Sequence, residues 1–190
     1  MNRQSIPALR RVGLAAGVAV TAALGAGAAA GATVPAAHAA AVATCATSQL
    51  KVWYGEPGGA AAGSSYLPLE FSNIGTTTCA LDGFPGVSGV ADDGSQLGTS
   101  ASWNHVIAPS NVVLSPGATA HVVLQIVDVY NYPPTTCKPT QASGLRVYPP
   151  NQTASVVVPY IFEACANTGP VYLNVDPVNA GVGIPQYSNT

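Results

Sequence analysis

The sequence has very few charged residues. Lys, Arg, Asp and Glu together make up 7% of its 190 residues, whereas a typical domain carries about 25%. Three of the six basic residues precede residue 40, so residues 40–190 hold three bases and all eight acids, a net charge of −5. A surface so poor in Lys and Arg cannot neutralise phosphates, so the sequence excludes nucleic acid as a partner and electrostatic attachment to anionic lipid.

Sequence motifs for catalysis and for cofactors are also missing. No phosphate-binding G-x-x-x-x-G-K-[ST] loop occurs, and neither His105 nor His121 is accompanied by a G-x-S-x-G nucleophile motif. No Cys-x-x-Cys pair exists, and no histidine lies near a cysteine at zinc spacing. We therefore predict a protein that is not an enzyme, with no catalytic residue, cofactor or metal.

Individual polar residues have structural explanations. His121 lies within a predicted strand and is expected at the surface or rim of a sheet, whereas His105 lies in the loop SWNHVIAPS beside Trp103. Glycosidase chemistry needs two carboxylates across a cleft, an arrangement that a single sequence cannot establish. Loop solvation, or pairing with the few bases, is the expected role of Glu56, Glu70, Asp128 and Glu163. Arg146 is expected in a structural ion pair.

The amino-terminal residues differ from the rest. Residues 1–39 begin with basic residues, continue with a long uncharged run of Ala, Val, Leu and Gly, and end in AAHAA. These are the three parts of a secretory signal peptide, with cleavage after Ala39. A membrane-spanning anchor is disfavoured because Ala and Gly contribute little insertion energy. We predict a secreted, extracellular protein, released or retained in the cell wall, with no transmembrane segment in the mature chain.

Four cysteines follow the predicted export signal. An even number of cysteines in an exported chain predicts two disulfides. Three pairings are possible, and we favour Cys45 with Cys79 and Cys137 with Cys165, which are neighbours in sequence. Each bond would close a loop of about 30 residues and contribute about 3 kcal/mol, mainly by restricting the unfolded chain.

Apolar residues alternate with polar ones through most of residues 40–190. The alternation groups Leu50, Val52 and Tyr54 on one face, and Ala120, Val122, Leu124 and Ile126 on another; in YLPLEFSN it groups Leu67, Leu69 and Phe71 inward, opposite Tyr66, Pro68 and Glu70. Dense Pro and Gly turns separate such segments, and no window has helical spacing. The sequence predicts one all-β domain, an antiparallel β-sandwich of seven to nine strands, with an extended tail after residue 178.

The segment LDGFPGVSGVADDGSQLG contains the adjacent carboxylates Asp92 and Asp93. Asp-Gly between two apolar strand ends predicts a hairpin turn, because both residues tolerate positive φ. Calcium would need about six regularly spaced oxygen ligands, and adjacent side chains on extended backbone diverge. We therefore predict a turn rather than a calcium loop or a catalytic pair.

Three aromatic residues are candidates for contact with a partner. DVYNYPPTTC presents Tyr130 and Tyr132 on a Pro-rich loop next to a cysteine, and Tyr on a stiff loop is good binding surface at low entropic cost. The alternative is that these rings pack the loop onto the sheet edge. Trp103 in the loop with His105 is the third candidate.

Four stretches together resemble a known family. YLPLEFSN, CALDGFPGVSGVADDGSQLG, LSPGATAHVVL and GLRVYPPN, with Cys45 ahead and Cys165 behind, resemble family 4232 of the domains of unknown function, which are secreted actinobacterial proteins. The resemblance covers about residues 45–178, and its corner motif maps onto Cys79, Leu81, Gly83, Phe84, Pro85, Gly86 and Val87. It implies an export signal and an immunoglobulin-like β-sandwich. It implies no activity, cofactor or catalytic residue.

These observations predict a signal peptide over residues 1–39 and a single secreted domain over residues 40–190. We expect a non-enzymatic binding or structural module of the cell exterior or envelope, whose partner is an extracellular protein, a glycan or a wall component. The alternative is a soluble inhibitor or a carrier of a small ligand. It would use the loop Tyr130–Thr136, or an apolar cleft near Trp53 or Trp103.

Overall fold

The computed structural model describes residues 41–184, so the predicted signal peptide lies outside the described residues. Over this range the chain forms thirteen strands, nine of three or more residues and four of only two. The prediction of an all-β fold with seven to nine strands is confirmed for the longer strands. The two-residue strands could not be predicted, because two residues show no periodicity.

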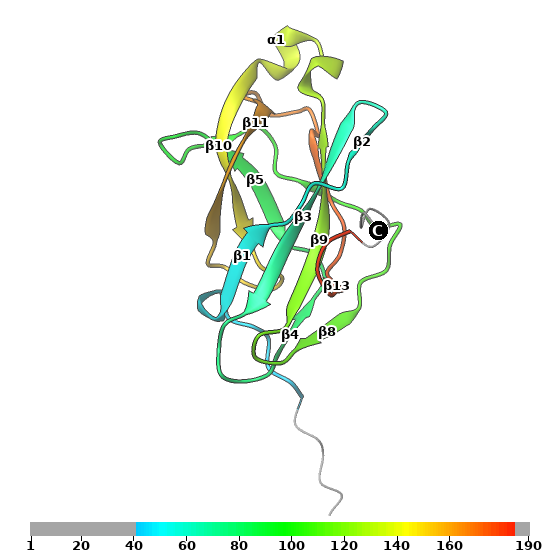
Figure 1. The fold of residues 1–190 in the computed structure, drawn as a ribbon. Helices are drawn as coiled ribbons and strands as arrows, with labels where there is room; N and C mark the ends of the chain where they lie inside the picture. The colour runs from blue at the N-terminus through cyan, green and yellow to red at the C-terminus, as the bar shows by residue number, and fades with distance from the viewer. Residues whose placement is uncertain (1–40, 185–190) are drawn as a thin grey trace, which may run out of the picture. The chain divides into compact units, whose positions relative to one another are not determined.

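The first sheet has β1, β3, β9, β12 and β7 in that order, with β2 beside β3 and β13 beside β9. Its pairs are antiparallel except β12 with β7, which is parallel. Figure 1 shows β1, β3 and β9 side by side. The strand bounds are β1 Leu50–Tyr54, β2 Ala60–Ala61, β3 Ser64–Asn73, β7 Ser102–Trp103, β9 Thr119–Val127, β12 Leu173–Val175 and β13 Asn179–Ala180.

The second sheet has four antiparallel strands in the order β11, β10, β5, β6, and a separate antiparallel pair joins β4 to β8. The bounds are β4 Cys79–Asp82, β5 Gly86–Val90, β6 Gln96–Leu97, β8 Asn111–Leu114, β10 Pro139–Tyr148 and β11 Val156–Cys165. The helical segments are short: η1 Thr47–Gln49, η2 Val129–Asn131 and α1 Pro134–Cys137.

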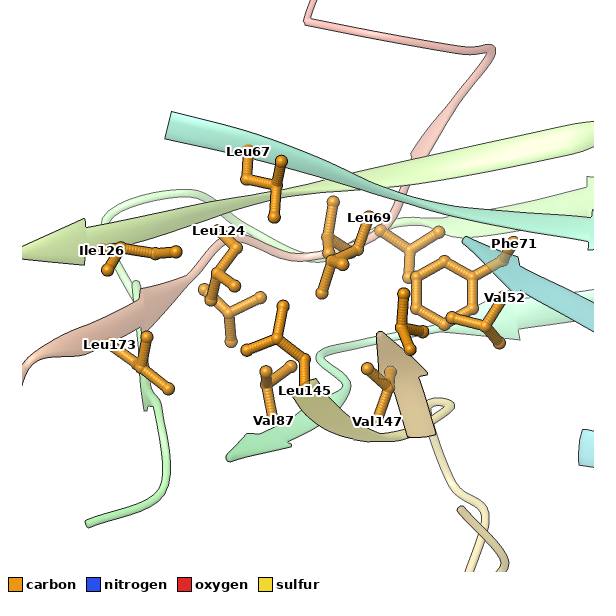
Figure 2. Close-up of a cluster of buried hydrophobic side chains, with 14 of the residues drawn as sticks. Val52, Leu67, Leu69, Phe71, Val87, Leu124, Ile126, Leu145, Val147 and Leu173 are labelled. Carbon is orange, nitrogen blue, oxygen red and sulfur yellow. The ribbon is translucent and has the colours of Figure 1, made fainter. Parts of the chain in front are cut away.

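The hydrophobic core lies between the two larger sheets, which pack face to face as a β-sandwich. Figure 2 shows side chains of β3 and β9, such as Leu69 and Leu124, directed toward Val87 of β5 and Leu145 of β10. Leu69, Leu124 and Leu145 are fully buried. The alternation predicted for residues 120–126 and 67–71 supplies these side chains, because every second residue of a strand faces the same side. The immunoglobulin-like strand order implied by the resemblance stays a prediction.

Tyr54 shares the predicted face of β1 with Leu50 and Val52 but is not buried. Tyr54 is 43% exposed, although Leu50 and Val52 on the same strand are buried as expected. β1 is the edge strand of its sheet, and Tyr54 at its end packs edge-on against Tyr160 of β11, with ring centroids 5.2 Å apart. Solvent reaches the space between the two sheets at this edge, so Tyr54 stays exposed although it lies on the inward face.

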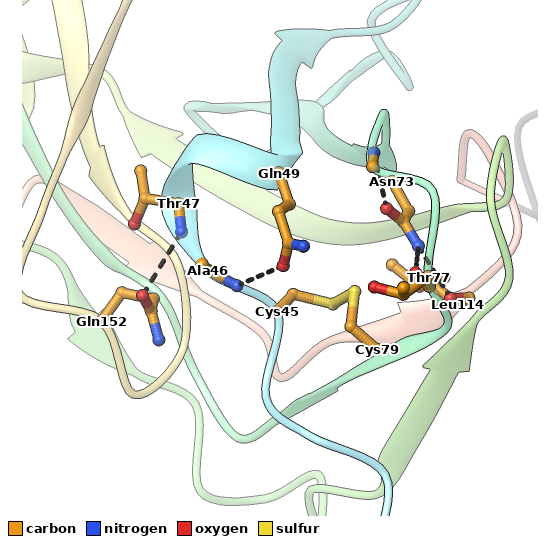
Figure 3. Close-up of a disulfide and its surroundings, with 10 residues drawn as sticks. Cys45, Ala46, Thr47, Gln49, Asn73, Thr77, Cys79, Leu114 and Gln152 are labelled. Carbon is orange, nitrogen blue, oxygen red and sulfur yellow. Dashed lines mark hydrogen bonds between the residues drawn. A yellow bond between two sulfur atoms is a disulfide. The ribbon is translucent and has the colours of Figure 1, made fainter.

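Both predicted disulfides are present. Cys45 is bonded to Cys79 and Cys137 to Cys165. Figure 3 shows that the first bond ties the segment before β1 to β4, next to the buried carboxamide of Asn73. That carboxamide donates to the carbonyls of Thr77 at 2.9 Å and Leu114 at 3.0 Å, so the disulfide and the buried Asn73 amide fix the same end of the sandwich.

The acidic pair lies in the turn that connects β5 and β6, as predicted. The Gly94 amide donates to the Ala91 carbonyl at 2.9 Å, and the Ser95 amide donates to Asp93 Oδ1 at 2.8 Å. Hydrogen bonds from Ser95 hold the pKa of the Asp93 carboxyl below its usual value. Gly94 has a φ of 79°, the conformation that favours glycine. Asp92 and Asp93 therefore shape a hairpin.

The segment after residue 178 lies on the first sheet as far as the structure describes it. β13 pairs antiparallel with β9, with Asn179 opposite His121 and Ala180 opposite Ala120. The amide of Gly183 then reaches the carboxyl of Glu70 at 2.6 Å. Part of the predicted tail is thus a strand added beside β9, and residues 181–183 beyond it contact Glu70 and His121 on the outer face.

Candidate functional site

The outer face of the first sheet carries a groove of about 720 Å³. Strands β3, β9 and β12 form its floor, and the residues that follow β7 form one wall. Aromatic and carboxamide side chains, one carboxylate and two valines line it: Tyr66, Trp103, Asn104, His105, Val106, Val123, Gln125, Asn174 and Asp176. A second, shallower depression of about 450 Å³ is lined by Ile126, Asp128 and the small Ala, Gly and Ser residues 60–65. Because these side chains are small, the depression offers little for recognition.

Strand pairing brings the floor of the groove together. Tyr66 of β3 lies opposite Gln125 of β9, and Gln125 lies opposite Asn174 of β12. The three residues therefore form one row across three strands that are about 4.8 Å apart. Gln125 is held in place, because its Nε2 donates to Ser64 Oγ at 3.0 Å.

The wall of the groove is fixed by Asn104. Its Nδ2 donates to Asp176 Oδ1 at 2.8 Å, and its Oδ1 accepts from the amide of Val106 at 3.2 Å. The amide of Asn104 itself donates to the carbonyl of Val175 at 2.9 Å. Asn104 thus uses both ends of its side chain to orient the Asp176 carboxylate and the loop that carries His105.

An aromatic cluster borders the groove. The rings of Phe84 and Trp103 are stacked, with centroids 5.3 Å apart and planes 10° apart. His105 meets both rings edge-on, at 5.3 Å from Phe84 and 6.1 Å from Trp103. The indole Nε1 donates to the carbonyl of Pro85 at 3.2 Å. Trp103 is nevertheless 50% exposed, so Phe84 covers only part of its side chain.

The Phe-Pro-Gly corner builds this cluster. Gly83 has a φ of 94°, which favours glycine, and it turns the chain from β4 into Phe84. The carbonyl of Gly83 accepts from the amide of Val178 at 3.0 Å. The corner that carries the family resemblance therefore positions the ring against which Trp103 stacks.

Two polar residues predicted at the surface are buried. Glu70 is 1% exposed and His121 is 3% exposed, so the prediction that His121 lies at the surface or rim, and that Glu70 serves loop solvation, is wrong. The two residues are cross-strand partners, and His121 Nδ1 lies 3.0 Å from the carbonyl of Gly181. The C-terminal segment covers them both. Burial raises the pKa of Glu70, against the opposing effects of the Gly183 amide and His121.

Arg146 also differs from the prediction. Its guanidinium donates to the carbonyl of Gly94 at 2.6 Å, and it therefore supports the turn at residues 92–95 through a backbone oxygen instead of a carboxylate. Of the predicted carboxylates, Glu56 and Glu163 are exposed. Asp128 caps η2 by accepting from the Tyr130 amide at 3.0 Å. Asp128 thus has a structural role.

The three candidate aromatic residues lie in different surroundings. Trp103 lines the groove, but the groove's lining includes neither Tyr130 nor Tyr132. Tyr130 is 67% exposed. Tyr132 packs against the core, and its hydroxyl donates to the carbonyl of Val171 at 2.8 Å. These contacts show that Tyr132 packs the loop onto the sheet, which was the alternative to a role in partner binding.

The groove is mixed in character, whereas the sequence suggested an apolar cleft near Trp53 or Trp103. Trp53 lies elsewhere, where its Nε1 donates to Ser72 Oγ at 3.1 Å. Tyr66, Gln125, Asn174 and Asp176 were not singled out from the sequence. The available signal was the spacing of Asn174 and Asp176, since polar residues two apart in the apolar segment VYLNVDPV share one face of a strand.

The His105 ring at the border of the groove lies edge-on to Phe84 and Trp103. Among residues 41–184, no cluster of three or more His, Cys, Asp or Glu side chains could hold a metal ion. Within the same residues, no helix has the length and apolar character needed to cross a membrane.

Comparison with curated proteins finds no match. A family model described as a domain of unknown function (DUF4232) matches residues 45–180. The match takes in both disulfides, the Phe84 corner and every residue that lines the groove. The chain belongs to the DUF4232 family.

Proposed function

We propose that this protein is a secreted, non-enzymatic binding module of the cell exterior, and that the groove beside Trp103 is its ligand site. Two disulfides support an oxidising compartment. The −5 charge of residues 40–190, the family match and the sandwich fold fit such a module but assign no reaction to it. Function on this kind of scaffold has to be argued from a site.

The groove carries the proposal. It is concave and lies on the face of a fully paired sheet, and it gathers oriented polar groups beside aromatic rings. A concave surface with a few convergent polar groups is the usual character of a ligand site. Asn104 and Ser64 hold Asp176 and Gln125 in place before any ligand arrives, and such preorganisation reduces the entropic cost of binding.

Export is part of the proposal. We infer that residues 1–39 are removed after Ala39, so that the mature protein begins at Ala40. The support is the basic, apolar and small-residue pattern of this segment. Amino-terminal sequencing of the protein recovered from producing cells checks it. A mature protein that keeps residues 1–39 contradicts it.

Co-sedimentation with the isolated cell envelope of the producing cells tests the function. We expect the purified protein, with both disulfides formed, to sediment with the envelope. Asn174→Ala should weaken binding about tenfold, the loss of about 1.4 kcal/mol of contact energy. Gln141→Ala is the matched control, because Gln141 is an exposed polar residue of the opposite sheet.

Two results would contradict this proposal. One is a wild-type protein that stays in the supernatant at every envelope concentration. The other is equal binding by Asn174→Ala and Gln141→Ala, with both variants shown to be folded by circular dichroism.

A second candidate function rests on Tyr130. This ring is 67% exposed on a loop that η2, α1 and the Cys137–Cys165 disulfide stiffen. An exposed Tyr on a stiff loop suits a soluble inhibitor of an extracellular protein. Pulldown from culture medium with wild type and Tyr130→Ala tests it: loss of a partner protein supports the inhibitor, and an unchanged set of partners contradicts it. Tyr132 is left intact because its contacts pack the loop.

A further inference from the structure

We propose that the groove binds a neutral carbohydrate chain, with pyranose hydroxyls hydrogen-bonded to Gln125, Asn174 and Asp176 and with sugar C–H faces against the aromatic residues of its wall. This inference rests on the proposed function and names its ligand class. No reaction is involved, since the chemical groups present bind and orient the ligand.

The charge of the site argues for a neutral ligand. The residues that line the groove include three titratable side chains, Tyr66, His105 and Asp176, and no Lys or Arg. An anionic polymer would meet the Asp176 carboxylate without a cation to offset it, in a chain whose residues 40–190 carry a net charge of −5. Phosphate-rich or uronic polymers are therefore disfavoured.

The polar groups match the hydrogen-bonding of hydroxyls. A hydroxyl donates one hydrogen bond and accepts up to two, and a carboxamide or carboxylate can serve neighbouring hydroxyls at the same time. Asn104 takes one position on Asp176 Oδ1, and a carboxylate offers about four acceptor positions. Asn174 and Asp176 are two residues apart, about 6.7 Å along a strand, and Gln125 is on the adjacent strand about 4.8 Å away. Hydroxyls spread around one sugar ring can reach such an array.

The aromatic residues provide the complementary apolar surface. Sugar rings have faces of C–H groups, and the flat faces of Trp, Tyr and His are suitable contacts for them. Trp103 keeps 50% of its surface exposed while stacked on Phe84, and Tyr66 is half-buried at the other side of the groove. Stacking on Phe84 and the hydrogen bond to the Pro85 carbonyl fix the indole, which lowers the entropic cost of using its exposed part in binding.

A peptide is a poorer occupant of this groove. Extended peptides bind by adding a strand to an exposed sheet edge, or by inserting apolar side chains. Strands β3 and β9 on the floor are paired along their lengths with neighbouring strands, so the floor offers no free backbone ladder. Its apolar contribution is limited to Val106 and Val123 beside the rings. Recognition has to come from side chains, and most of these are polar.

Periodate provides the test, because it cleaves the vicinal diols of sugars and spares most protein. Envelope is oxidised with periodate and then reduced, or digested with protease, and the binding of the purified protein is measured at about 0.05 M and about 0.5 M NaCl. We expect periodate to weaken binding at least about tenfold, and protease and salt to change it less than about twofold. Asp176→Asn, which keeps the hydrogen bond from Asn104, should weaken binding to untreated envelope about tenfold.

The outcomes separate this inference from the proposed function. Binding that survives periodate and is lost after protease treatment overturns the carbohydrate and leaves an envelope module that recognises protein. Binding that falls steeply as the salt concentration rises overturns the inference that the ligand is neutral. Wild-type protein that never sediments overturns the proposed function. Isothermal titration with cellohexaose and maltohexaose, whose residues carry the vicinal diols that periodate cleaves, then identifies the sugar, and a wild-type signal that Asp176→Asn lacks confirms the site.

Discussion

Glu70 and His121 face each other across β3 and β9, and both are buried beneath the C-terminal segment. One carboxyl oxygen of Glu70 accepts from the Gly183 amide at 2.6 Å, whereas the other, Oε2, is buried and has no hydrogen-bond partner among residues 41–184. A buried carboxylate with an unpartnered oxygen is costly when it is ionised. The chain therefore holds an acid whose charge state bears on its stability.

Stability should increase as the pH is lowered from neutral through the titration of Glu70. Burial raises the folded-state pKa of Glu70 above its usual value, so the native state takes up this proton at a higher pH than the unfolded chain does. The stabilisation is complete below the unfolded-state pKa and is lost as the pH rises through the folded-state pKa. Urea denaturation from pH 7 to pH 4 should show this trend in wild type relative to Glu70→Gln.

The control for this prediction is Glu163→Gln. Glu163 is exposed on β11, so its variant should keep the wild-type pH profile. Subtracting profiles removes contributions shared by all three proteins, including that of Asp93. A wild-type profile parallel to that of Glu70→Gln would show that Glu70 titrates alike in both states, and it would contradict the prediction.

Removing the hydroxyl of Tyr172 should cost about 1 kcal/mol. The Tyr172 ring is fully buried, and its hydroxyl donates to the carbonyl of Leu97 at 2.8 Å. Burial raises the pKa of this phenol to about 12, so it remains a donor over the range in which the protein is handled. Chemical denaturation of Tyr172→Phe measures the loss. Tyr130→Phe, with its ring exposed, should be neutral, and equal effects would show that the buried bond contributes nothing.

The features that could be predicted from the sequence depend on residues close together in the chain or on a pattern that repeats along it. Alternation identified the core residues of β3 and β9. The cysteines paired with their neighbours in sequence, and Asp93-Gly94 formed the expected turn. Tyr54 lies on the predicted face of β1 and is still exposed, because alternation does not reveal which strand is at an edge.

The burial of Glu70 and the makeup of the groove depend on contacts between distant segments. Gly183, which covers Glu70, lies 113 residues further along the chain. The row Tyr66, Gln125 and Asn174 comes from three strands whose neighbours follow from sheet topology. A polar residue on a strand has the same pattern whether it is solvated, covered or part of a site, so periodicity could not distinguish these roles.

Each disulfide should contribute about 3–4 kcal/mol. The bonds span 34 residues for Cys45–Cys79 and 28 residues for Cys137–Cys165, so the loop-entropy model gives them nearly equal weight. Guanidinium unfolding of Cys45→Ala/Cys79→Ala and of Cys137→Ala/Cys165→Ala measures the two separately. Alanine is chosen because all four sites are buried. A loss below about 1 kcal/mol in either variant would show that restriction of the unfolded chain is not what that bond provides.

Gly98→Ala should be among the most destabilising single changes in the chain. Gly98 has a φ of 60°, and a Cβ added there would lie 2.6 Å from the Cys165 carbonyl oxygen and 3.0 Å from Tyr172 Cε1. The oxygen belongs to the backbone next to a disulfide, so it cannot move aside easily. We expect a loss of more than about 2 kcal/mol in thermal or chemical unfolding.

The matched control for Gly98 is Gly117→Ala. Gly117 also has a positive φ, 82°, but a Cβ there would meet no atom within 4 Å. Its variant carries the backbone strain without the clash, and it should lose about 1 kcal/mol. The difference between the two variants isolates the steric part. Equal losses would show that the junction of β6 with Cys165 relaxes around a methyl group, and that the packing beneath Tyr172 is looser than its burial indicates.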